Sequence, residues 1–249
     1  MSYKNVCNEL ECVITCVNYS DFLAHTLPLN KGHFDRVVVV TTPEDKATQR
    51  VCEFWHVECI QESRFTDNAS FCKGAGINTG LYALGKKGWV LHMDADIVLP
   101  PTFRSHVNHG QLNTHHIYGA DRFMVKSFEE WEQFISFPRL QHEADIFVHT
   151  HEFTMGQRIY KPEEYGYIPI GYFQLWHNDS GIQSYPENHQ TAARGDMIFS
   201  LYWDRAHRSL LPEVICYHLE SEEVAMGTNW CGRKTKLFGI TPPALKVIE

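Results

Sequence analysis

The sequence predicts an α/β fold with a central, mostly parallel sheet flanked by helices. Strand and helix signals alternate through the first half of the chain with short links, the order that sets parallel strands side by side through right-handed crossovers. The segment 36–41 carries four consecutive valines, a composition typical of a strand that is buried on both faces. We expect any functional site to lie at the carboxyl edge of this sheet.

The elements of the first half follow from local patterns. Residues 11–17 predict a strand. The apolar residues of 43–55 recur with helical spacing, and a third strand is predicted at 56–61. Residues 70–84 predict a helix, with Gly85 just past its end. A buried strand then begins at Trp89.

The second half has a mixed pattern. A strand is predicted at 117–125, and Ser127 with Glu130 forms a capping box that opens a helix through Ile135. Aromatic and polar residues alternate over 165–176, and a further helix is predicted near 196–202. Because no repeat or long linker interrupts the chain, we expect a single domain over residues 1–249.

Composition narrows the class of protein. The eight cysteines include no C-x-x-C pair, and no apolar run is long enough to span a bilayer. The start of the chain lacks the regions of a signal peptide, so we expect a cytoplasmic protein with reduced thiols and no membrane span. A formal net charge of −8 gives no overall attraction to nucleic acid.

The strand from Trp89 runs directly into Asp94 and Asp96. Residues i and i+2 of an extended backbone point to the same side, so both carboxylates can converge on one hard cation at the sheet edge. An Asp-x-Asp on its own more often marks a solvated turn. Its position at the end of a buried strand favours a ligand site.

Two motifs carry a resemblance to a known family. Residues 71–84 contain a lysine and an Asn-x-Gly ahead of the Asp-x-Asp strand 93–96, and residues 214–219 end in His-Leu ahead of Asn-Trp-x-Gly-Arg at 229–233. Together they resemble the glycosyltransferases of GT-A fold related to family 2. The resemblance implies a GT-A (Rossmann-like) sheet, a nucleotide-sugar-binding half over about 1–100, and an acceptor-binding half over about 101–249 with a C-terminal lid.

It also implies a reaction. The expected activity is metal-dependent transfer of a sugar from a nucleotide-diphosphate donor, by default a UDP-sugar, to an acceptor hydroxyl with inversion. A divalent ion, Mn²⁺ or Mg²⁺, would act as Lewis acid on the departing phosphate. Asp96 is the expected direct ligand, Asp94 reaches the ribose or a metal-bound water, and His218 completes the metal shell and favours manganese. The alternative for His218 is a core histidine.

Further donor-binding residues are expected in turns and basic loops. Tyr19 would stack on the base and Glu44 or Asp45 would accept from it, although these segments also make ordinary turns and caps. Lys73 would lie near the diphosphate, or be an exposed lysine at a helix start. Trp230, Arg233 and Lys234 fall in the expected lid, 221–236. The complete expected donor set is Tyr19, Glu44, Lys73, Asn78, Asp94, Trp230, Arg233 and Lys234.

The acceptor side is the least constrained. Asp196 stands where inverting relatives carry a Glu-Asp pair and is the expected general base, although Gly195 replaces the first acid and an N-cap is the alternative. Tyr172 and Trp176 would stack on the acceptor, or else form sheet core. The acceptor itself stays open among a saccharide, a protein, a small molecule and a hydroxymethylated base in phage DNA. A sugar-phosphate nucleotidyltransferase and a non-catalytic nucleotide-sugar-binding protein are the rival functions.

Overall fold

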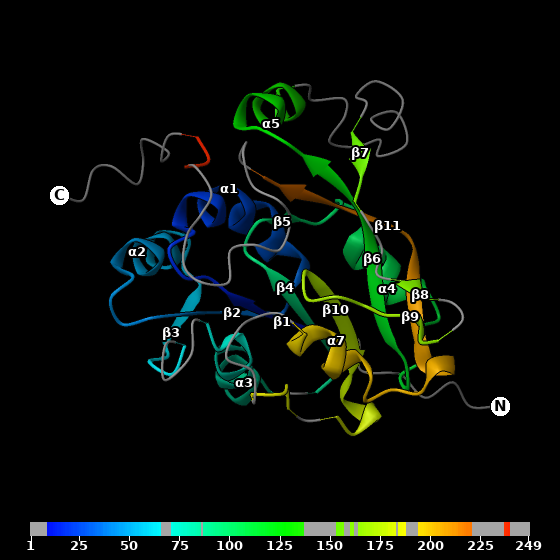
Figure 1. Ribbon diagram of the computed structural model, residues 1–249. Helices are drawn as coiled ribbons and strands as arrows, with labels where there is room; N and C mark the ends of the chain where they lie inside the picture. Colours follow the sequence, from blue (N-terminus) through cyan, green and yellow to red (C-terminus); the bar gives the residue numbers. More distant parts are fainter. Residues whose placement is uncertain are drawn as a thin grey trace.

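The computed structural model describes residues 9–65, 71–85, 87–136, 153–156, 160–161, 164–182, 184–187, 194–220 and 237–239. They form one nine-stranded sheet in the order β3-β2-β1-β4-β10-β6-β11-β5, with β7 beside β6, and a two-stranded sheet β8-β9 (Figure 1). The strands are β1 Leu10–Thr15, β2 Arg36–Thr41, β3 Glu58–Gln61, β4 Trp89–Asp94, β5 Ile97–Val98, β6 Ile117–Val125, β7 Thr154–Met155, β8 Tyr160–Lys161, β9 Gly166–Tyr167, β10 Phe173–His177 and β11 Arg208–Leu219.

The helices are α1 Ser20–Asn30, α2 Lys46–Phe54, α3 Lys73–Ala83, α4 Phe103–His109, α5 Phe128–Ile135 and α7 Gly195–Ser200, with the short 3-10 turns η1 Lys31–His33, η3 Asn178–Ser180 and η4 Arg205–His207. Strands β1, β2, β3, β4, β6 and β11 run in one direction, and β10 is reversed between β4 and β6. This arrangement confirms the predicted fold class, a mostly parallel sheet flanked by helices. The antiparallel strands β5, β7 and β10 make the second half of the sheet mixed.

Helices cover both faces of the sheet. One core cluster joins the sheet to α1, α2 and α4, and a second joins its other face to α3 and α7 (Figure 1). Helix α3 lies close against the strands at Gly80, where an added Cβ would stand 2.5 Å from a methyl of Val13 and 3.1 Å from one of Val40. Only a glycine permits this approach. The Asn-x-Gly spacing of the sequence therefore has a packing reason on this helix.

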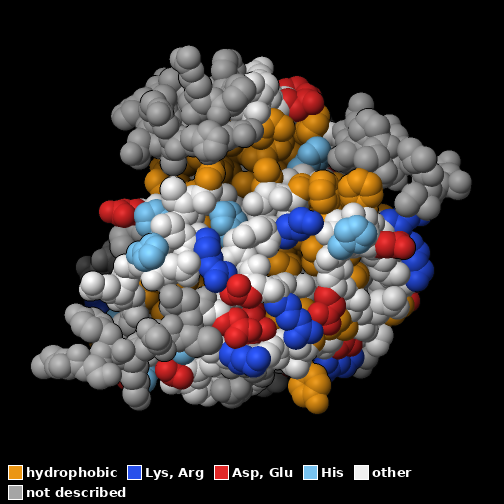
Figure 2. Space-filling view, turned by 180° about the vertical axis from the view of Figure 1, so that it is seen from behind, with side chains coloured by type: hydrophobic (Ala, Val, Ile, Leu, Met, Phe, Trp, Pro, Cys, Tyr) orange, Lys and Arg blue, Asp and Glu red, His pale blue; other side chains and the backbone are white. Residues whose placement is uncertain are grey.

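One face of the molecule can be compared with the expectation from the net charge. Figure 2 shows one face of the molecule, on which acidic and basic side chains are interspersed over the described part of the chain. Such a face offers no extended field of one sign to a nucleic acid. Every helix among the described residues is too short or too polar to be a candidate membrane span.

A third core cluster fastens the last described segment, 237–239, to the body of the fold. Phe238 is fully buried, its ring stacks on Phe22 of α1 with centroids 4.7 Å apart, and its backbone N–H donates to Asp21 at 2.6 Å. Gly239 follows with a φ of +71°, and the ring of Phe128 leaves no space there for a Cβ. The segment is therefore held by an aromatic contact, a buried hydrogen bond and a backbone conformation that suits glycine.

We predict that Phe238→Ala destabilises the fold by about 3–5 kcal/mol, because it removes a buried ring and leaves a cavity against Phe22. Leu237→Ala is the matched control, since Leu237 is 74% exposed, and it should change stability by less than about 0.5 kcal/mol. Urea unfolding of the three proteins measures both values. Equal midpoints for the two variants would contradict the anchoring role of Phe238.

Candidate active site

The Asp-x-Asp turn lies between β4 and β5 and is held from two sides. On one side, α1 supplies Thr26 Oγ1, which donates to Ala95 O at 2.6 Å, and Asn30, whose amide donates to Ile97 O at 2.7 Å and accepts from Leu99 N at 2.9 Å. On the other side, the N–H of Leu219 in β11 donates to Asp96 O at 2.9 Å. The backbone of the turn is therefore fixed before any ligand arrives.

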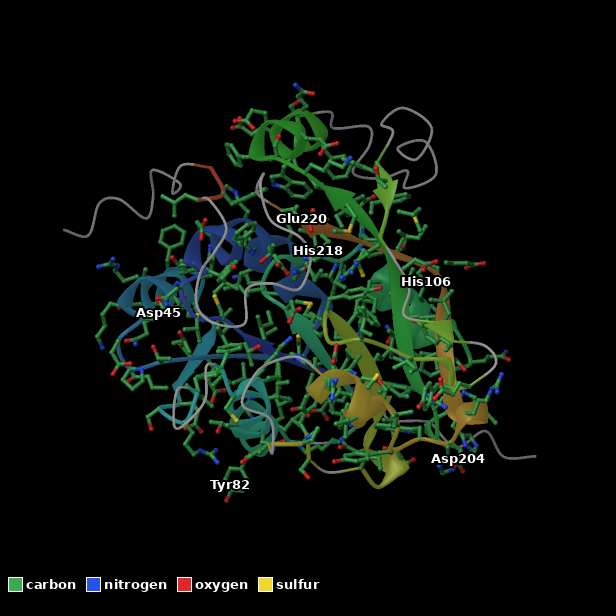
Figure 3. All side chains as sticks on the ribbon, viewed as in Figure 1. Asp45, Tyr82, His106, Asp204, His218 and Glu220 are labelled. Carbon is green, nitrogen blue, oxygen red and sulfur yellow. The ribbon has the colours of Figure 1, made fainter. Side chains whose placement is uncertain are left out.

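Asp96 and His218 meet at this turn. His218 Nε2 lies 3.2 Å from Asp96 Oδ2, and Figure 3 shows His218 near Glu220 at the end of β11. Burial alone would raise the pKa of Asp96, but the neighbouring His218 holds that pKa below its usual range. Asp96 Oδ1 and His218 Nδ1 are buried without a hydrogen-bond partner in the described structure.

Asp94 lies with a different cation. Lys73 Nζ, at the first turn of α3, donates to Asp94 Oδ1 and lies 3.4 Å from Gly171 O. Burial raises the pKa of Asp94 and the nearby Asp96 raises it further, whereas Lys73 acts in the opposite direction. The predicted proximity of Lys73 to the Asp-x-Asp turn is thus present, and the ammonium group contacts a carboxylate.

These side chains can be tested for their fit to a divalent cation. No group of three His, Cys, Asp or Glu side chains within the described residues is arranged to hold a metal ion. Asp96 nevertheless has a buried carboxylate oxygen without a donor, and an imidazole stands beside it. A carboxylate oxygen is a ligand that Mn²⁺ and Mg²⁺ accept, and an imidazole nitrogen is a ligand of first-row transition metals. Asp96 and His218 therefore fit part of such a site, while Asp94 is engaged by Lys73.

Asp196 lies next to the same corner of the fold. It is the second residue of α7, and its Oδ2 accepts from Gly171 N at 2.8 Å while its Oδ1 accepts from Met197 N at 2.8 Å. Arg194, with a φ of +75°, occupies the N-cap position, so Asp196 is not the cap that the sequence left as an alternative. Gly171 therefore lies between the two charged side chains. Its N–H donates to Asp196, and its carbonyl oxygen accepts from Lys73.

Tyr19, Glu44 and Asp45, which were expected to bind the base of the sugar donor, differ in burial and in contacts. Tyr19 is half-buried with its ring stacked on Phe22 at 5.4 Å. Glu44 is exposed, whereas its neighbour Asp45 is buried and caps α2 by accepting from Thr48 N at 3.0 Å. Of the two acids that the sequence left open as partners of a base, Asp45 has the capping role and Glu44 points to solvent.

Asn78 is engaged by a distant loop. Its Oδ1 accepts from Tyr185 N at 2.6 Å, and its Nδ2 donates to Tyr185 O and to Glu187 Oε1, both at 2.8 Å. Gly74, one turn earlier on α3, lies so close to Pro186 that a Cβ would clash with the Pro186 carbonyl. Asn78 thus fastens residues 184–187 to α3, and both its amide nitrogen and its amide oxygen are engaged in these contacts.

On the acceptor side, the structure favours the sheet-core alternative for Trp176. Its side chain is 2% exposed and packs against Phe199 with ring centroids 5.0 Å apart, which leaves no face for stacking on a ligand. Tyr172 is also buried, but it lies beside the site. Its hydroxyl donates to Ala120 O, and its ring is 6.4 Å from that of His218 at an interplanar angle of 14°.

Sequence reasoning missed the charged residue on the other side of Tyr172. The guanidinium carbon of Arg122, in β6, lies 4.0 Å from the centre of the Tyr172 ring. The available signal in the sequence was an arginine within the largely apolar strand 117–125, and the structure shows that it is buried. Trp230, Arg233 and Lys234, with the expected lid 221–236, lie outside the described residues.

A polar cluster supports the loop that Asn78 holds. Arg64 forms ion pairs with Glu62 at 2.8 Å and Glu187 at 3.2 Å, and Thr79 of α3 donates to Glu62 at 2.5 Å. Burial acts to raise the pKa of Glu62, but the hydrogen bonds from Arg64 and Thr79 outweigh it and lower that pKa to about 2. The ionised Glu62 is therefore a structural group next to the site.

Comparisons with protein-family models and with curated sequences give no match. Solved structures of similar fold include glucosyl-3-phosphoglycerate synthase of Mycobacterium tuberculosis in complex with Mn²⁺ and UDP-glucose (11% identity, TM-score 0.47, 85% of this chain and 69% of that chain). A second is mannosyl-3-phosphoglycerate synthase of Rubrobacter xylanophilus (15% identity, TM-score 0.44, 69% of this chain and 53% of that chain). A third is inositol-1-phosphate CTP transferase of T. maritima (10% identity, TM-score 0.48, 86% of this chain and 91% of that chain). The chain spans about half the length of the second of these proteins.

We predict that Glu62→Gln lowers stability at pH 7 by about 1–3 kcal/mol, because it removes a carboxylate that receives charge-assisted hydrogen bonds. The pKa of Glu62 is lowered on folding, so its contribution is complete above pH 4.5 and is lost as the pH falls towards 2. The difference between wild type and variant should shrink over that window in urea unfolding. Glu58→Gln, in a half-exposed pair with Arg36, should cost less than about 1 kcal/mol. A pH-independent difference would contradict the assignment.

Proposed function

We propose that this protein is a metal-dependent glycosyltransferase that moves a sugar from a nucleotide diphosphate, by default UDP, to an acceptor hydroxyl. The observation that carries the proposal is the Asp96–His218 pair at the carboxyl edge of the sheet, with a buried carboxylate oxygen that lacks a donor. Residues 1 to about 100 would bind the donor and about 101–249 the acceptor, within a single domain.

In the proposed enzyme, Asp96 and His218 hold the divalent cation, which, when bound, neutralises the charge of the departing diphosphate. Lys73 keeps a positive charge beside Asp94, where it can also attract the diphosphate. Tyr19 offers the exposed part of its ring to the base. Its other face rests on Phe22, which in turn rests on Phe238, so the ring has a rigid support.

Asp196 is the proposed general base. Its Oδ2 is oriented by the N–H of Gly171, and the same glycine carbonyl faces Lys73. The carboxylate would take the proton of the acceptor hydroxyl as that oxygen attacks the anomeric carbon from the side opposite the leaving diphosphate. Inversion of configuration follows from this geometry of attack.

We predict that nucleotide release requires a divalent ion and that Asp96→Ala reduces it to background, because the ion that would neutralise the leaving group then loses its carboxylate ligand. The assay measures UDP released from UDP-sugars with Mn²⁺, Mg²⁺ or chelator, without added acceptor. Asp179→Ala, which changes an aspartate that is 68% exposed, should retain wild-type turnover. Full release in chelator would sink the metal role.

The same assay separates the rival functions. A nucleotidyltransferase would release pyrophosphate from a nucleoside triphosphate, whereas a glycosyltransferase releases a nucleoside diphosphate. A non-catalytic binding protein would bind the nucleotide sugar and release neither. Mass spectrometry of the products identifies which of these occurs.

We predict that Asp196→Asn lowers transfer by roughly 10²- to 10⁴-fold with unchanged donor affinity, because the amide oxygen can still accept from Gly171 but has no basicity. Transfer is measured with a saccharide acceptor, and donor affinity by calorimetry. Asp179→Asn makes the same change at an exposed aspartate and serves as the control, with transfer expected at the wild-type rate. Near-normal transfer would return Asp196 to a purely structural role at the start of α7.

A further inference from the structure

A buried guanidinium lies far from the candidate active site. Arg208, the first residue of β11, is only 9% exposed. Its Nε and Nη1 are buried and have no hydrogen-bond partner within the described chain. A buried arginine is ordinarily paired, because removing its charge from water without compensation is costly. Arg208 therefore presents donors to which the described residues supply no acceptor.

A second unpartnered donor lies in the connection that leads to Arg208. Trp203 follows α7 and is 5% exposed, and its indole N–H also has no partner among the described residues. Arg208 pairs with Ile117 across β6 and β11, and Ile117 belongs to the same core cluster as Trp203. Arg208 and Trp203 thus carry three buried nitrogen atoms, Nε and Nη1 of Arg208 and Nε1 of Trp203, that have no acceptor among the described residues.

The charges around Arg208 favour an anion. Burial lowers the pKa of Arg208, and the neighbouring Arg205 of η4 lowers it further, whereas Asp204 acts in the opposite direction. Two neighbouring guanidinium groups repel each other, and Asp204 offsets part of that repulsion. Phosphoryl and carboxylate groups match the planar donors of arginine.

We propose that Arg208, with the indole N–H of Trp203, forms a binding site for an oxyanion, a phosphoryl or carboxylate group of a small molecule. The site is separate from the proposed active site. Arg208 and His218 pair with Ile117 and Met124 of β6, seven residues apart, so they are about 23 Å from each other along the strand. Figure 3 shows Asp204, next to this site, at the opposite end of the sheet from His218.

The test measures binding of inorganic phosphate and of acetate to the full chain by calorimetry, at constant ionic strength and without nucleotide or divalent metal. Wild type should bind one equivalent of at least one anion in the millimolar range. Arg208→Met removes the charge but keeps an unbranched apolar side chain, and should weaken this binding by about 10-fold or more. Trp203→Phe keeps a ring without the N–H and should weaken it several-fold.

Arg36→Met is the matched control, since Arg36 lies on β2 and its side chain is 39% exposed. It should bind the anion as wild type does. Absence of saturable binding in wild type, or equal binding by Arg208→Met, would overturn the proposal, and the wild-type measurement decides even if Arg208→Met fails to fold. Preference for phosphate over acetate identifies the ligand group as phosphoryl, and the reverse as carboxylate. Because no donor or metal is present, the result is independent of the proposed transferase activity.

Discussion

The fixed backbone of the turn after β4 is the constraint on which the candidate site depends. Thr26 and Asn30 bind the carbonyls of Ala95 and Ile97 from one side, and β11 binds Asp96 O from the other. The short β5 then pairs with β11 in a register that sets His218 opposite Ile97. A shift of one residue would turn His218 to the other face of the sheet. The Asp96–His218 contact therefore depends on hydrogen bonds to the main chain of this turn and on the pairing of β5 with β11.

Two aspartates separated by one residue have different electrostatic environments. Asp94 has a raised pKa despite Lys73, and Asp96 has a lowered pKa because of His218. Close carboxylates disfavour simultaneous ionisation, and the two cations come from different elements, α3 and β11. The two aspartates of the motif therefore have pKa values shifted in opposite directions, although the sequence pattern treats them alike. In the proposed enzyme, Asp96 is the better-prepared carboxylate for a cation.

Much of this arrangement could be predicted from the sequence because it depends on local patterns. The four valines give β2 at the predicted residues, and the Asp-x-Asp follows its strand. Helix α1 was not predicted, because it is buried on most of its sides and contains Pro28, so it lacks an amphipathic pattern. Asn78 and Trp176 show a second limit. Their partners, Tyr185 and Phe199, lie far along the chain, and no local pattern indicates whether such side chains contact a ligand or another loop.

Charge balance explains why the site can hold several acids in a partly buried place. Three acids, Asp94, Asp96 and Glu220, lie near the cationic side chains Lys73, His218 and Arg122. Burial raises the pKa of Glu220 and the nearby Asp96 raises it further, whereas His218 and Arg122 lower it. Arg122 also lies over Tyr172, whose ring is nearly parallel to His218, so the cation is held by an aromatic face. In the proposed complex, a divalent cation and a diphosphate would bring charges of opposite sign. Their joint binding would disturb this balance less than either alone, so each should favour the binding of the other.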